Sequence, residues 1–250
     1  MKIATWNMGS LYENGNFDRN VEIFQRILEK VFADIICLQE CPDDEKLRQK
    51  IMTWGNYSHS CFEMYADNHN CPGHKMGLAV FARSEIMIKS NVVLHSPRPK
   101  GENVFSHDIE NIHDKIFMTV DITDNDTAMR IVTGHGFCFH RYGWDNDSEL
   151  HAAAYKDLDS YLRKELNGVD DRIHIVCADF NYDRIQNDVA FLMEQYEDVF
   201  DQELTRPSNR KTDGLFVKKG LEYQLAGMVR SIRNKPNGLG FDHYLLWVEI

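Results

Sequence analysis

The stretch Ile173-His174-Ile175-Val176-Cys177-Ala178-Asp179-Phe180-Asn181 decides how the chain folds. Ile173 to Ala178 form a nearly continuous apolar run rich in β-branched side chains, which is typical of a strand buried on both faces. The run ends in Asp179 and Asn181, whose spacing of two lets both side chains point the same way. Open α/β sheets bind ligands beyond the carboxyl ends of their strands, so this stretch predicts a functional edge of a sheet.

A simpler interpretation of Asp179 and Asn181 also exists. The two residues could form an Asx turn, or cap a helix that begins near Asp183. The choice between turn and active site depends on what the chain places at its other strand ends.

Length and composition indicate a single α/β domain over residues 1–250. The sequence lacks both a run of about eighteen apolar residues and an amino-terminal basic segment followed by an apolar one, so we expect no membrane span and a cytoplasmic protein. Its six cysteines are scattered, several of them within apolar runs, which indicates reduced thiols rather than a disulfide framework.

The net charge of −11 argues against a protein that coats nucleic acid through positive charge. It does not exclude an enzyme that acts on phosphates through a metal ion. Residues 1–200 carry 20 basic and 33 acidic side chains, whereas residues 201–250 carry 8 and 6 and include a basic loop over residues 205–211. We expect Arg210 and Lys211 of this loop to contact an anionic substrate.

Polar residues follow several other predicted strands. A strand over residues 2–6 is followed by Asn7, and a second over residues 33–38 is followed by Gln39 and Glu40, with a helix between them. Further strands are predicted over residues 115–122 and 129–133, joined by a hairpin, and over the carboxyl-terminal residues. The polar residues at the ends or entries of these strands, with those after residue 178, are Asn7, Glu40, His135, Asp179, Asn181, Asp213, Asp242 and His243.

The segment over residues 137–144 is rich in aromatic side chains and also carries Arg141. Tyr142 and Trp144 could stack on a base or sugar of a substrate. Equally, aromatic residues here could clamp a loop to the body of the protein. A second segment holds His59, Cys61, His69, Cys71 and His74, but it lacks the paired spacing of zinc sites.

Several short motifs together resemble the endonuclease/exonuclease/phosphatase superfamily, which has the pancreatic-deoxyribonuclease-like fold. The matching motifs are Thr5-Trp6-Asn7, Leu38-Gln39-Glu40, Thr133-Gly134-His135, Ala178-Asp179-Phe180-Asn181, Lys211-Thr212-Asp213 and Phe241-Asp242-His243. The resemblance implies a four-layer α/β sandwich, with two mixed sheets packed face to face, helices on the outside and a phosphoesterase cleft at one rim.

The resemblance also implies roles for these residues. Glu40 would be the principal ligand of Mg²⁺ or Mn²⁺, with Asn7 and Asp242 as further oxygen ligands. Asp179 would orient or deprotonate the attacking water, and Asn181 would donate to a phosphoryl oxygen. His243, held in one tautomer by Asp213, would contact the phosphate or transfer a proton, and His135 would bind the phosphate or act as general acid.

Two departures from the family pattern bear on the substrate. Abasic-site endonucleases of this superfamily carry a tyrosine where His135 stands, which argues against a dedicated abasic-site repair role. The glutamate that backs this histidine in the deoxyribonuclease would fall near Lys75. We therefore expect a hydrolase of phosphate esters, with nucleic acid among its candidate substrates and no protein partner implied. The alternative is a catalytically silent phosphate-binding module of the same fold.

Overall fold

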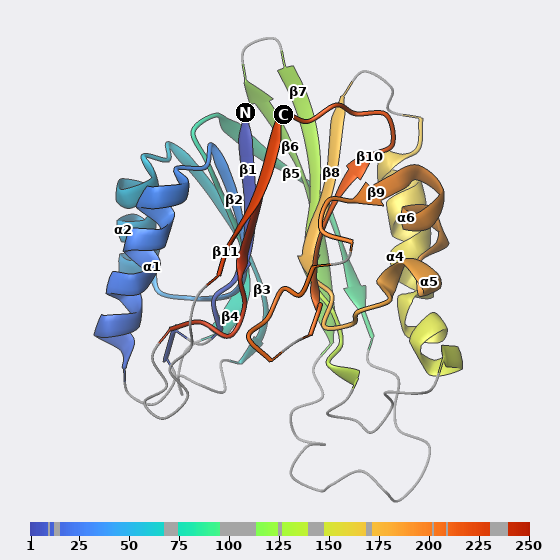
Figure 1. The fold of residues 1–250 in the computed structure, drawn as a ribbon, viewed down its shortest axis with the longest axis horizontal. Coiled ribbons are helices and arrows are strands. Elements are labelled where there is room, and N and C mark those ends of the chain that lie inside the picture. Colours follow the sequence, from blue (N-terminus) through green and yellow to red (C-terminus); the bar gives the residue numbers. More distant parts are fainter. Residues whose placement is uncertain are drawn as a thin grey trace, which may run out of the picture.

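The computed structural model describes residues 1–9, 11–12, 16–67, 75–95, 114–124, 127–139, 148–168, 172–201, 203–208, 210–230 and 240–250. Within these residues the strands form two six-stranded sheets that face each other, and helices cover the outer face of each sheet (Figure 1). This is the four-layer α/β sandwich that the sequence predicts.

The first sheet contains both ends of the chain. Its strands are β1 (Lys2–Asn7), β2 (Ile35–Pro42), β3 (His59–Asp67), β4 (Lys75–Ala82), β11 (Leu225–Val229) and β12 (Leu245–Glu249). They lie in the order β11-β12-β1-β2-β4-β3. β1 runs parallel to β2 and antiparallel to β12, so the first and last strands of the chain lie side by side (Figure 1).

The second sheet is formed by the middle of the chain. Its strands are β5 (Glu85–Leu94), β6 (Lys115–Asp124), β7 (Thr127–His135), β8 (Ile173–Asp179), β9 (Tyr196–Asp198) and β10 (Asp213–Lys218). They lie in the order β5-β6-β7-β8-β10-β9. β7 and β8 run parallel, and His135 lies directly opposite Asp179 at their carboxyl ends.

Helices cover the outer face of each sheet (Figure 1). α1 (Phe17–Val31) and α2 (Glu45–Gly55) cover the first sheet, whereas α4 (Ser148–Leu166), α5 (Ile185–Asp188) and α6 (Ala190–Gln195) cover the second. None of the helices in the described ranges is long and apolar enough to cross a membrane.

The packing of α1 shows how the sequence fixes these layers. Its buried apolar residues recur at helical spacing, and Phe24 stacks on Trp6 of β1 at a centroid distance of 5.0 Å. Complete burial of Phe24 and Leu28 contributes roughly 1.5–3 kcal/mol each. The helix ends at Phe32, which adopts a left-handed conformation with φ 51°.

The core has three apolar layers, one between each sheet and its helices and one between the two sheets. The layer between the sheets is formed by residues such as Val80 and Leu215.

The five cysteines that the structure describes are free, as the sequence predicts. The helix expected near Asp183 is instead two short helices, α5 and α6, separated at Val189. His59 and Cys61 lie on β3, whereas His69, Cys71 and His74 fall outside the described residues.

Candidate active site

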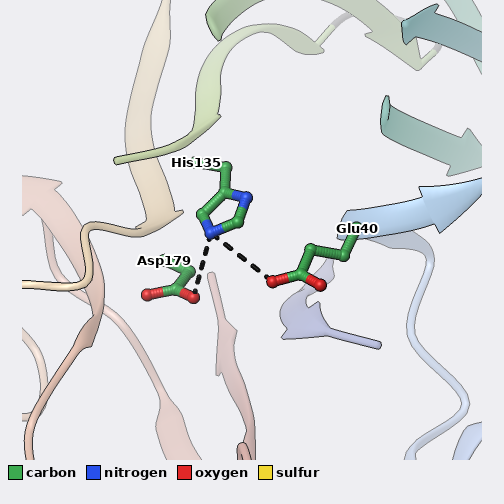
Figure 2. Close-up of side chains that lie close together, drawn as sticks. All are labelled: Glu40, His135 and Asp179. Carbon is green, nitrogen blue, oxygen red and sulfur yellow. Dashed lines mark ion pairs between the residues drawn. The ribbon is translucent and has the colours of Figure 1, made fainter. Parts of the chain in front are cut away.

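The carboxyl ends of four strands meet at one edge of the sandwich. The parallel pair β1 and β2 brings Asn7 and Glu40 together in the first sheet, and the parallel pair β7 and β8 brings His135 and Asp179 together in the second. Figure 2 shows Nε2 of His135 pointing towards the carboxylates of Glu40 and Asp179, each at 3.6 Å. Residues from both sheets thus converge on one point, as the sequence predicts.

Glu40 is aimed by an irregularity in its strand. The register of β2 against β4 shifts between Leu38 and Cys41, and Glu40 adopts a left-handed conformation with φ 51°. β-Bulges of this kind re-aim side chains and are common next to active sites. The backbone of Gly9 passes so close that an added Cβ would overlap Oε2 of Glu40, so glycine here leaves room for this position of the carboxylate.

Asn7 connects the acidic groups of the two sheets. Its Nδ2 donates to Glu40 Oε1 at 3.1 Å and to Asp179 Oδ2 at 2.7 Å, while its Oδ1 accepts the backbone N–H of Gly9 at 2.8 Å. The amide therefore holds both carboxylates at a fixed separation.

Asp179 combines the two interpretations that the sequence left open. Its Oδ1 accepts the backbone N–H of Asn181 at 2.8 Å, which is an Asx turn, and Asn181 has a left-handed φ of 54°. Its Oδ2 faces the site. Nδ2 of Asn181 lies 2.7 Å from Nε2 of His135 and donates to the carbonyl of Gly136 at 3.3 Å. Asp179 therefore forms the Asx turn with Oδ1 and takes part in the candidate site with Oδ2, and the turn helps to position the side chain of Asn181.

Asp213 and His243 form a buried pair on the other side of Asp179. Nδ1 of His243 lies 2.9 and 3.0 Å from the two carboxylate oxygens of Asp213, and its Nε2 lies 3.7 Å from Asp179 Oδ2. Asp213 is opposite Asp179 in the antiparallel pairing of β10 with β8. The hydroxyl of Thr205 accepts the backbone N–H groups of Thr212 and Asp213, which fixes the start of β10.

The electrostatics of the site follow from burial and charge. Burial raises the pKa of Asp179 to about 6, although the charge of His243 opposes the shift. Burial lowers the pKa of His243, but the carboxylates of Asp213, Asp179 and Asp242 outweigh it and raise this pKa to about 9. A carboxylate with a pKa near neutrality next to a cationic imidazole is suited to proton transfer.

Asp242 lies at the same edge but is bound by an arginine. Its Oδ2 lies 2.5 Å from Nη2 of Arg206, whose Nε donates to the carbonyl of Asp242 at 3.2 Å. The charges of Asp179 and Asp213 also act on this guanidinium. From the sequence, Arg206 is only one member of a basic patch that could hold a nucleic acid strand, and its contact with Asp242 was not predicted.

Among the residues that the structure describes, two groups of side chains have ligand atoms close enough to hold a metal ion. One is Glu40, His135 and Asp179, and the other is Asp179, Asp213 and His243; within each group the ligand atoms lie within 4.8 Å of one another. Asp242 belongs to neither group. Carboxylate oxygens are the ligands that Mg²⁺ and Mn²⁺ prefer, and the group at Glu40 lies next to the amide of Asn7. This donor set fits a hard divalent cation.

Of the five residues expected to bind substrate, the structure describes two, and these two have different surroundings. Arg210 is exposed, whereas Lys211 forms an ion pair with Asp198 at 2.5 Å and donates to the carbonyl of Phe200 at 2.6 Å. Arg141, Tyr142 and Trp144 lie outside the described residues. Two nearby aromatic residues, Phe137 and Phe139, are buried in the core beneath α4 and anchor residues 137–139 to the body.

His135 has a neighbour that the sequence analysis missed. Lys75, the position expected for a backing glutamate, pairs with Asp67 at the surface. Instead, the hydroxyl of Tyr65 lies 2.5 Å from Nδ1 of His135. No local pattern marked Tyr65, because its approach to His135 depends on how the two sheets pack.

The chain is similar to one known protein family and to several solved structures. The model of the Endonuclease/Exonuclease/phosphatase family matches residues 4–216. A family protein from Leptotrichia buccalis C-1013-b is 17% identical, with a TM-score of 0.67 over 100% of this chain and 99% of that one. Comparison with curated protein sequences finds no match.

Two further structures share the fold at low identity. TDP2 from D. rerio, complexed with a single-strand DNA product, is 16% identical, with a TM-score of 0.66 over 99% of this chain and 97% of that one. ANGEL2, a 2′,3′-cyclic phosphatase in complex with adenosine-2′,3′-vanadate, is 12% identical, with a TM-score of 0.68 over 99% and 94%. Because the family model spans most of the sequence, the chain belongs to the endonuclease/exonuclease/phosphatase family.

Proposed function

We propose that this protein is a divalent-metal-dependent phosphoesterase that hydrolyses a phosphodiester or a phosphomonoester with an activated water molecule. The observation that carries the proposal is the place of Asp179, a fully buried carboxylate that belongs to both groups of candidate metal ligands. Its Oδ2 faces imidazole nitrogens of His135 and His243 at 3.6 and 3.7 Å. Such convergence of titratable groups is typical of an active site rather than of a structural ion pair.

Each residue then has a role in hydrolysis. Asp179, with its pKa raised by burial to about 6, orients the attacking water and accepts its proton. The amide of Asn181, whose hydrogens point to Nε2 of His135 and to the carbonyl of Gly136, would turn one of them to a phosphoryl oxygen when the substrate binds. His243, whose Nδ1 is fixed by Asp213, presents Nε2 to the phosphate. His135, at the end of β7, binds the phosphate or donates a proton to the leaving oxygen.

Glu40 and Asn7 would hold Mg²⁺ or Mn²⁺ at the first sheet. When bound, the ion supplies positive charge that stabilises the developing charge on the phosphoryl oxygens. Asp242 stays a proposed ligand, but it would have to share its carboxylate between the ion and Arg206. Arg206 itself supplies positive charge at an otherwise acidic site.

We propose a nucleic acid end or a small phosphorylated molecule as substrate. The net charge of −11 disfavours long duplex DNA, because a protein binds duplex mainly by neutralising its phosphates. TDP2 is known with a single-strand DNA product, and ANGEL2 is a 2′,3′-cyclic phosphatase. Both likenesses are compatible with a terminal phosphate as the group that this site binds.

A substrate panel tests the proposal. Plasmid DNA, oligonucleotides with terminal or cyclic phosphates, phosphoinositides, sphingomyelin and nucleotides would each be incubated with the protein and Mg²⁺. We expect turnover of at least one substrate, its loss on chelation by EDTA, and a large loss in Glu40→Gln. Turnover that survives EDTA would contradict the metal role. Binding of Mg²⁺ and phosphate esters without any turnover would instead identify a catalytically silent binding module.

A further inference from the structure

Tyr65 reaches the active site from the edge strand of the first sheet. Its Oη lies 2.5 Å from Nδ1 of His135, and its ring lies edge-on to the imidazole at a centroid distance of 5.7 Å. On the opposite side of the ring, Nδ2 of Asn181 lies 2.7 Å from Nε2. The imidazole is therefore held between a phenol of one sheet and an amide that follows a strand of the other.

The backbone is adapted to bring Tyr65 to this place. The register of β3 against β4 shifts between Met64 and Ala66, which leaves Tyr65 as the extra residue of a bulge. The register of β2 against β4 also shifts, between Leu38 and Cys41. Gly77 of β4 lies next to both shifts, because it pairs with Cys41 of β2 and with Met64 of β3. Two bulges at the same level of one sheet thus direct a carboxylate and a phenol to the same imidazole.

The hydrogen bonds of Asn181 indicate which nitrogen of His135 carries the proton. Its amide has two hydrogens, of which one points to Nε2 of His135 and the other to the carbonyl of Gly136 at 3.3 Å. If Nε2 accepts, the proton of the neutral imidazole is on Nδ1 and points at the phenol oxygen. The phenol oxygen is the atom that faces Nδ1, at 2.5 Å.

We propose that Tyr65 is a positioning residue, whose phenol oxygen accepts a hydrogen bond from Nδ1 of His135 and so keeps Nε2 directed into the active site. The phenol can accept from Nδ1 whether or not Nε2 carries a proton, so the ring keeps its orientation through a proton transfer at Nε2. The two imidazoles of the site thus have different partners, a carboxylate behind His243 and a phenol behind His135. This inference rests on the proposed function, in which His135 serves the reacting phosphate.

Nuclear magnetic resonance of the metal-free protein tests the hydrogen bond without any need for turnover. Long-range ¹H–¹⁵N spectra of histidine-labelled protein distinguish protonated from unprotonated ring nitrogens, and a His135→Asn variant assigns the signals. We expect Nδ1 of His135 to be protonated in the wild type and this preference to be lost in Tyr65→Phe. Tyr57→Phe, which removes another buried hydroxyl, one that lies in the core between the first sheet and its helices, should change nothing. A proton on Nε2 in the wild type, or an unchanged Tyr65→Phe spectrum, would overturn the proposal.

Kinetics on the substrate found by the panel test the consequence. Loss of a partner that orients a site residue typically costs about 10-fold to 100-fold in activity, and we expect this loss in kcat of Tyr65→Phe with little change in KM. In a His135→Asn background the same substitution should cost nothing more, because Tyr65 acts through His135. An equal loss in both backgrounds would show a merely structural role. Absence of turnover in the wild type would count against the proposed function, while the spectra would still decide the role of Tyr65.

Discussion

Oδ2 of Asp179 lies 2.7 Å from Nδ2 of Asn7, so a single amide joins a strand of the second sheet to a strand of the first. The same amide donates to Glu40. The groups that we assign to catalysis come from both sheets, so they are in place only when the two sheets are packed together. The geometry of the site is therefore a direct product of the packing of the sandwich core.

A buried polar bridge supports this junction just beneath the site. Nε2 of Gln39 donates to the hydroxyl of Thr5 at 3.0 Å and to that of Thr133 at 3.2 Å. Gln39 and Thr133 are fully buried and belong to different sheets. Because buried polar groups are costly when unpaired, the bridge favours one relative placement of the sheets.

Gly9→Ala should weaken Mg²⁺ binding. The added methyl group would overlap Oε2 of Glu40 and push the carboxylate away from Asn7, so we expect the affinity measured by calorimetry to fall by about 10-fold or more. Gly220→Ala is the matched control, because that glycine has a positive φ but no atoms near an added Cβ. The control should lose some stability but keep its affinity for Mg²⁺. Equal affinities for all three proteins would contradict the placement of Glu40 as a ligand.

Thr205→Val should destabilise the protein and lower its turnover. The substitution keeps the shape of the side chain but removes the hydroxyl that accepts two backbone N–H groups at the start of β10. Leaving buried donors unpaired should cost about 2 kcal/mol in the free energy of unfolding, measured in urea. Thr205→Ser retains the hydroxyl and should cost less. If the serine variant proves as unstable as the valine variant, the hydroxyl does not have this role.

Asp121 should make a pH-dependent contribution to stability. Burial raises the pKa of this carboxyl, but hydrogen bonds from Arg130 and Arg172 outweigh burial and hold the pKa below its ordinary value. A lowered folded-state pKa means that the contribution is present above the unfolded value of 3.8 and is lost as the pH falls through the folded-state pKa. Removing one partner of such a buried pair typically costs about 3 kcal/mol, which we expect for Asp121→Asn near neutral pH.

Urea unfolding over a pH series measures this effect. The difference in unfolding free energy between the wild type and Asp121→Asn should shrink as the solution is made more acidic. Asp157→Asn, at an exposed position of α4, is the control and should show little difference at any pH. A difference for Asp121→Asn that stays constant down to strong acid would contradict the linkage.

The candidate site residues that the sequence predicts lie at the ends or the entries of strands. A strand such as β8 is visible as an apolar run, and its carboxyl end is marked by Asp179, so the sequence alone indicates both the strand and its polar end. The Asx turn at Asn181 was also readable, because it depends on residues two positions apart. The four-layer sandwich was predicted from the resemblance to the endonuclease/exonuclease/phosphatase superfamily, which rests on the motifs at these strand ends.

Features that depend on contacts between distant segments could not be read in this way. Tyr65 comes to His135 through a bulge in an edge strand, and a bulge leaves no pattern in the alternation of side chains. Arg206 meets Asp242 only because residues 36 positions apart are brought together at the rim. Lys211 is predicted from its basic loop to contact the substrate, and the sequence does not reveal its ion pair with Asp198. Long-range packing decides each of these three cases.

The turnover of Asp179→Asn tests the central claim most directly. The variant keeps the size of the side chain but removes the carboxylate that would accept the proton of the attacking water. In the presence of Mg²⁺, and on the substrate that the panel identifies, we expect kcat to fall by about 100-fold or more while the protein remains folded. A variant that hydrolyses this substrate at the wild-type rate would contradict the assignment of this edge of the sandwich as the active site.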